Sequence, residues 1–127
     1  MQKITGIGGS FFLAKDPQAL AKWYEANFGI DQTPTDYDQP GWQQQAGTTV
    51  FAPFPHDTTY FGNASNTWML NFRVNDLAAM IEQLRDAGIE VNPDPKNPYP
   101  NGSFAHLHDP EGNRIELWQP ASRDAGQ

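Results

Sequence analysis

The sequence predicts an α+β fold in which one module, a strand, a helix and further strands, occurs twice along the chain. In each half a strand-like segment runs directly into an apolar-striped helix that begins at an aspartate, in Leu13-Ala14-Lys15-Asp16 and again in Arg73-Val74-Asn75-Asp76. Each helix ends near a glycine and is followed by more strand-like segments. A length of 127 residues is typical of a single domain. We therefore expect one domain over 1–127, with module one at about 3–55, a linker at about 56–66 and module two at about 67–119.

In the first half, residues 3–14 favour a strand, with glycines that leave room beside it. Asp16 and Pro17 are suited to a helix start, and the apolar residues that follow recur at helical spacing: Leu20, Trp23, Tyr24 and Phe28. Gly29 is a natural stop. The sequence then predicts a short strand and loops over 31–41 and a pair of strands over 42–54.

The second half repeats this order. Asp76 is expected to cap a helix that ends before Gly88, and a strand precedes the helix at 67–74. The next strand begins at 89–91 and leads into a proline-rich loop at 93–102. Two further strands, 103–108 and 113–119, are joined by Asp109-Pro110-Glu111-Gly112, a strong turn signal.

Composition excludes several classes of function. The formal net charge is −7 and no cluster of lysine and arginine occurs, which argues against nucleic-acid and anionic-membrane partners. The chain has no cysteine, so disulfides, thiolate nucleophiles and zinc–thiolate sites are excluded. Neither a membrane-spanning run nor a secretory signal is visible in the sequence, and a cytoplasmic protein is the expectation.

Three segments resemble the vicinal oxygen chelate superfamily, which holds the glyoxalase, bleomycin-resistance and dioxygenase proteins. They are Phe11–Asp16 with Trp23-Tyr24 and Phe28-Gly29, then Asn71–Leu77 with Ala87–Val91, and finally His108–Leu117 with its D-P-E-G-N turn. The resemblance implies two βαβββ modules that form a curled, half-open barrel around a central cavity for a small molecule. It also implies pairing of modules between chains, and because an open edge strand needs cover we expect a homodimer.

The resemblance further implies a divalent metal at the start of the first strand and the middle of the last strand of each module. In this sequence those positions are Gly9, Phe51, Met69 and Glu116. Only Glu116 is a metal-ligand type, whereas a catalytic site needs about three protein ligands. We therefore expect no metal and no other cofactor, and the case for metal-dependent glyoxalase or dioxygenase activity is weakened.

Strand side chains alternate between faces, which predicts the residues that face the cavity. A turn centred on Glu111 places His106 opposite Glu116, within hydrogen-bonding reach. This pair is the candidate catalytic dyad, since a carboxylate fixes the tautomer of a histidine base. The predicted ligand-binding residues are Phe11, Phe51, Met69, Asn71, Arg73, Phe104, His108 and Trp118.

Each of these assignments has an alternative. His106 and Glu116 could be a cross-strand pair that only satisfies two half-buried polar groups, or part of a shifted metal site. Arg73 would bind a ligand carboxylate or phosphate or lie at the solvent rim. Three functions follow: a metal-independent protein that binds a small aromatic or amphiphilic molecule, a lyase or isomerase that uses His106 and Glu116, and a dioxygenase-like enzyme with an unconventional metal site.

Overall fold

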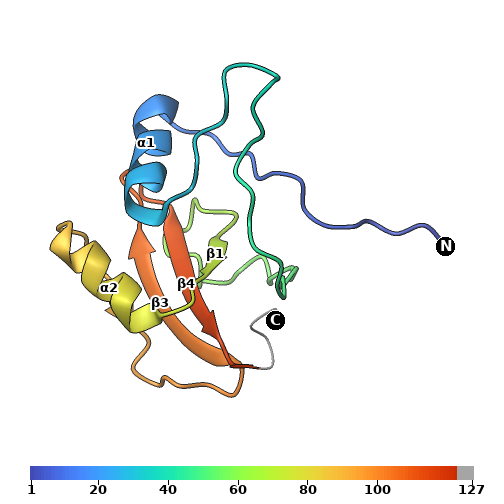
Figure 1. Cartoon of the computed structure of the whole chain (residues 1–127). Coiled ribbons are helices and arrows are strands. Elements are labelled where there is room, and N and C mark those ends of the chain that lie inside the picture. The colour runs from blue at the N-terminus through green and yellow to red at the C-terminus, as the bar shows by residue number, and fades with distance from the viewer. Residues whose placement is uncertain (123–127) are drawn as a thin grey trace.

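The computed structural model describes residues 1–122 and contains two helices and one four-stranded sheet (Figure 1). In chain order the elements are α1 (Pro17–Phe28), β1 (Leu70–Arg73), α2 (Leu77–Asp86), β2 (Asn92–Pro93), β3 (Gly102–His108) and β4 (Arg114–Pro120). The sheet order is β1-β4-β3-β2, in which β1 and β4 are parallel and the other pairs antiparallel. The second half of the chain therefore forms a strand–helix–three-strand module in the predicted order, although the strand expected to begin at 89–91 lies at Asn92–Pro93. Over residues 1–122, no helix has the length and apolar character needed to cross a membrane.

Both helices begin where the sequence predicts. The Asp16 side chain accepts a hydrogen bond from the Ala19 N–H at 3.1 Å, and Asp76 does the same for Ala79 at 3.0 Å. Each aspartate satisfies an N–H group that has no partner inside the helix. Gly29 ends α1 with φ of 70°, a left-handed conformation that favours glycine.

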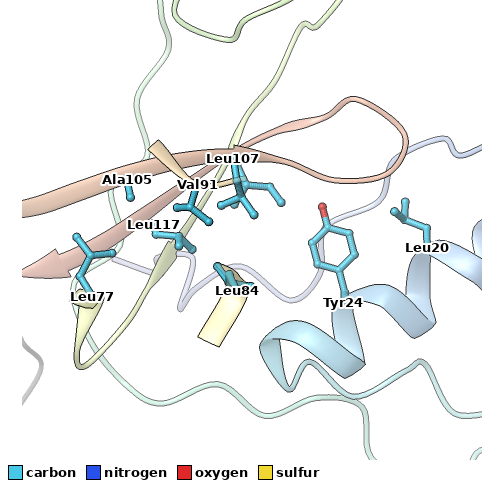
Figure 2. Close-up of a cluster of buried hydrophobic side chains, with 9 residues drawn as sticks. Leu20, Tyr24, Leu77, Leu84, Val91, Ala105, Leu107 and Leu117 are labelled. Atoms are coloured by element: carbon cyan, nitrogen blue, oxygen red, sulfur yellow. The ribbon is translucent and has the colours of Figure 1, made fainter. Parts of the chain in front are cut away.

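The hydrophobic core lies between the helices and one face of the sheet, here called the helix face (Figures 1 and 2). Leu20 and Tyr24 of α1 and Leu77 and Leu84 of α2 pack against alternate residues of β3 and β4, namely Ala105, Leu107, Ile115 and Leu117. Full burial of a leucine or isoleucine stabilises the fold by about 1.5–3 kcal/mol. Because side chains alternate, the remaining residues of these strands lie on the opposite face, here called the open face.

The turn between β3 and β4 fastens the sheet to α1. The Asp109 carboxylate, only 4% exposed, accepts hydrogen bonds from the Tyr24 hydroxyl at 2.7 Å and from two backbone N–H groups of its own turn. The Glu111 carboxylate accepts from the backbone N–H groups of Lys15 and Asp16, which lie just before α1. The acidic residues of the D-P-E-G-N motif thus have a structural role.

The first half of the chain differs from the prediction. The structure has helix α1, but residues 3–14 and 42–54 form no strands, and no strand occurs within 31–41. The expected second sheet, which would complete an eight-stranded barrel, is therefore not seen in residues 1–122. A strand needs a neighbouring backbone to pair with its N–H and C=O groups, and neither segment pairs with a strand of the sheet. Phe12 and Ala14 pack against the core, but Phe11 is 96% and Phe51 86% exposed.

Candidate functional site

A buried histidine–glutamate pair lies on the open face at the centre of the β3–β4 hairpin. The register sets His106 opposite Glu116, with His108 opposite Arg114 and Phe104 opposite Trp118, which confirms the predicted pairing. His106 Nε2 lies 2.9 Å from Glu116 Oε2, and the two residues are only 9% and 8% exposed. The geometry expected of the pair is confirmed, whereas its catalytic role stays a prediction.

The Glu116 carboxylate is held by three neighbours. Besides His106, Asn71 of β1 donates to Oε1 at 2.8 Å and the Tyr60 hydroxyl donates to Oε2. Burial raises the pKa of Glu116, but the hydrogen bonds from His106, Tyr60 and Asn71 outweigh it and hold the pKa below its usual value. The carboxylate is therefore anionic at neutral pH. Because it only accepts hydrogen bonds, the network assigns a hydrogen to His106 Nε2.

Tyr60 is the site residue that sequence reasoning missed. It belongs to the segment 55–66, predicted only as a linker, and its hydroxyl also lies 3.1 Å from His106 Nε2. Burial and the hydrogen bond to Glu116 raise the pKa of Tyr60, so the phenol stays protonated and donates. The signal that could have found it is the aromatic pair Tyr60-Phe61 within an otherwise polar linker, since aromatic side chains in linkers usually pack on something.

Arg114 joins the same group of side chains. Its guanidinium lies 5.2 Å from the centre of the Tyr60 ring and donates to the Tyr60 backbone carbonyl. A cation over an aromatic face is an attractive arrangement. Arg114 thus holds the linker against the open face at the position of the histidine–glutamate pair.

A hollow of about 310 Å³ opens beside this network, and its wall holds residues of both signs. Tyr60, His106 and Arg114 form one side, and the remaining lining residues are Asn92, Pro93, Asp94, Pro95 and His108. A second hollow, of about 340 Å³, includes Trp23, Leu107 and Asp109 in its lining, but the Asp109 carboxylate is already engaged by the β3–β4 turn. We assign the candidate site to the first hollow, because His106, whose side chain is paired with the buried Glu116, lines it.

The other predicted site residues fall into two groups. Asn71, Phe104, His108 and Trp118 share the open face with the pair, and Phe104 stacks on Trp118 at 6.3 Å between ring centres. Arg73 donates to the backbone carbonyl of Gln45 at 3.0 Å, so its guanidinium binds Gln45 rather than lying free at the rim. Met69 lies just before β1, whereas Phe11 and Phe51 are exposed and are not brought into the hollow.

The residues present do not fit the divalent metal that the resemblance implies. Over residues 1–122 no three His, Cys, Asp or Glu side chains come close enough to hold an ion. Gly9, Phe51 and Met69 offer no oxygen or nitrogen side-chain ligand, and both oxygens of Glu116 already accept hydrogen bonds. A carboxylate and one imidazole fall short of the usual ligand set.

Comparisons with known proteins agree with this fold. At 20% identity, a structure from the mobile metagenome of V. Pseudocholerae aligns over 96% of this chain and 99% of that one, with a TM-score of 0.64. A glyoxalase family protein from Bacillus anthracis aligns over 82% and 84% at 19% identity and a TM-score of 0.52. At these identities the likeness concerns the fold alone.

TnmS3, an antibiotic-binding protein from Streptomyces sp. CB03234, is 27% identical over 91% of this chain and 100% of that one, with a TM-score of 0.54. No curated protein matches the chain. A family model described as a glyoxalase-like domain matches residues 10–118, which is most of the sequence. The chain therefore belongs to the glyoxalase-like domain family, in agreement with its resemblance to the vicinal oxygen chelate superfamily.

Proposed function

We propose that this protein binds a small organic molecule on the open face of its sheet without a metal, as a cytoplasmic binding protein. The observation that carries the proposal is the hollow beside Tyr60, His106 and Arg114, which combines aromatic surface with a few fixed polar groups. Small-molecule sites usually have this composition. The likeness to the antibiotic-binding TnmS3 supports the same class of function.

We further propose that residues 3–14 and 42–54 pair as the strands of module one and close the half-open barrel around this site. These segments carry most of the large exposed apolar side chains: Ile4, Ile7, Phe11, Leu13, Trp42, Val50, Phe51 and Phe54. Exposure of so many apolar side chains to water is unfavourable in free energy. β1 is an edge strand of the sheet, and Arg73 at its end already contacts Gln45. Pairing along β1 would bring Phe11 and Phe51 to the ligand cavity.

We also propose a homodimer of twofold symmetry, because the resemblance implies that modules of this superfamily pair between chains. Sedimentation at a few tens of micromolar protein should report twice the monomer mass, and amide hydrogen exchange should show protection over 3–14 and 42–54. A monomer would refute the dimer alone. Fast exchange in both segments would refute the second sheet.

Native mass spectrometry of freshly purified protein tests the binding function. We expect less than one transition-metal ion per chain, and a retained small molecule or one recovered after incubation with a metabolite extract. The His106→Ala variant should lose this adduct, whereas Glu82→Gln, a change at an exposed residue of α2 that lines neither hollow, should keep it. A stoichiometric metal that is lost in Glu116→Gln would refute the metal-free proposal.

A second candidate is a lyase or isomerase in which His106 transfers a proton and Glu116 orients it. The 2.9 Å contact between the two side chains favours it. The retained molecule distinguishes the candidates: an enzyme converts it over time and loses that conversion in Glu116→Gln, whereas a binding protein returns it unchanged.

A further inference from the structure

The polar site on the open face already holds a phenol, which is the side chain of Tyr60. Its hydroxyl donates to Glu116 Oε2 and lies 3.1 Å from His106 Nε2. The His106 ring meets it edge-on at 5.5 Å between centres, and the Arg114 guanidinium lies over its face. Each part of a phenol, the hydroxyl, the ring edge and the ring face, thus has a partner here.

The charge of the site favours a hydroxyl group over an acid. Glu116 is an anion that is 8% exposed, and it needs donors around both of its oxygens. A ligand hydroxyl would supply the donor that Tyr60 now provides. A ligand carboxylate would place a second anion against Glu116, which is unfavourable in a partly buried site.

The Tyr60 side chain also lies in a segment that can move out of the polar site. It is 38% exposed and lies in a segment without helix or strand. The bonds between backbone groups near it are local turns, from Thr58 to Pro55 and from Gly62 to Thr59, and the Arg114 side chain provides the long-range bond to the Tyr60 carbonyl. Beside it, Phe54 stacks on the Tyr60 ring at 5.9 Å and is itself 45% exposed. Segments with few buried contacts open at low free-energy cost.

We propose that the ligand of this site is a hydroxylated aromatic compound whose phenolic ring takes the place of Tyr60, and that residues 54–61 act as an internal plug that the ligand displaces. This inference rests on the proposed binding function and names its ligand class. The rest of the molecule would extend into the adjoining hollow along Asn92, Asp94 and His108. Phenols would therefore compete with a group of the protein itself.

The test uses p-cresol, which has the shape of a tyrosine side chain, and toluene, which lacks the hydroxyl. Calorimetric titration compares the wild type with Tyr60→Ala, which empties the site. We expect Tyr60→Ala to bind p-cresol at least tenfold more tightly than the wild type does, and to prefer it over toluene by about tenfold, since a hydrogen bond to a charged acceptor has that value. Glu116→Gln added to Tyr60→Ala should abolish most of the preference.

Hydrogen exchange of the wild type tests the plug. Saturating p-cresol should speed exchange over residues 54–61, and binding without that change would refute displacement. Equal binding of p-cresol and toluene to Tyr60→Ala would refute the phenol class while small-molecule binding stands. Binding of neither probe to Tyr60→Ala or to Tyr60→Phe would refute the inference, while the adduct found by native mass spectrometry would still decide the binding function.

Discussion

Replacing His106 by alanine tests whether the buried pair stabilises the fold. In the structure Glu116 has three donors, and the variant removes one of them, leaving Tyr60 on Oε2 and Asn71 on Oε1. A lost hydrogen bond to a charged group costs about 1–3 kcal/mol. The loss should stay below the 3–5 kcal/mol of a buried charge left without a partner, because two donors remain.

Urea denaturation at pH 7 measures this loss, and His108→Ala is the matched control. His108 lies on the same strand and the same face, two residues along, but it is exposed. Its replacement should change the free energy of unfolding by no more than about 0.5 kcal/mol. Equal stabilities of the two variants would refute the reasoning. A stable His106→Ala that has lost its ligand would instead show that the pair serves binding.

The effect of pH on the free energy of unfolding tests the charge state of Glu116. The pKa of Glu116 in the folded protein lies below its ordinary value of 4.5, so the folded state favours the charged carboxylate. Its contribution is complete above about pH 4.5 and is lost as the pH falls through the lower folded pKa. The stability difference between the wild type and His106→Ala should therefore shrink in acid. A difference that grows below pH 4 would contradict the assignment.

Three further outcomes are expected from denaturation of single variants. Asp109→Ala should lower the free energy of unfolding by about 3 kcal/mol or more, because it leaves the Tyr24 hydroxyl and two turn N–H groups without their acceptor. Tyr24→Phe should lower it by about 1–2 kcal/mol. A larger loss for Tyr24→Phe than for Asp109→Ala would contradict these roles. Gly102→Ala should destabilise the protein more than Gly112→Ala. Both glycines have positive φ, but a Cβ at Gly102 would lie 2.2 Å from the Gln119 carbonyl oxygen, whereas one at Gly112 meets nothing within 4 Å. Equal denaturation midpoints of the two variants would contradict this steric contact. Glu111→Gln should weaken α1 by about 0.5–1.5 kcal/mol, since it removes the charge that accepts from Lys15 and Asp16, and unchanged far-UV circular dichroism melting would speak against that link.

The sequence determined the local features whose causes are local. Asp16 and Asp76 start helices because their side chains accept from the N–H groups of the first turn, and Gly29 ends one because it tolerates a left-handed conformation. The D-P-E-G-N turn fixed the hairpin register, and the two-residue period of strands then placed His106 and Glu116 on one face. The sequence also indicated the family, because the motifs that resemble it lie at the helix starts and in the β3–β4 hairpin.

The tertiary structure decided what depends on contacts between distant segments. Tyr60 lies 56 residues from Glu116 in sequence, and no periodicity relates a linker residue to a strand. Likewise, Asp109 was expected only to form a turn, and its bond to the Tyr24 hydroxyl could not be read from spacing. Conversely, the strands that the sequence predicts over 3–14 and 42–54 are absent from the structure. The alternation of apolar and polar residues indicates which face of a strand would be buried, but a strand forms only where a neighbouring backbone pairs with it.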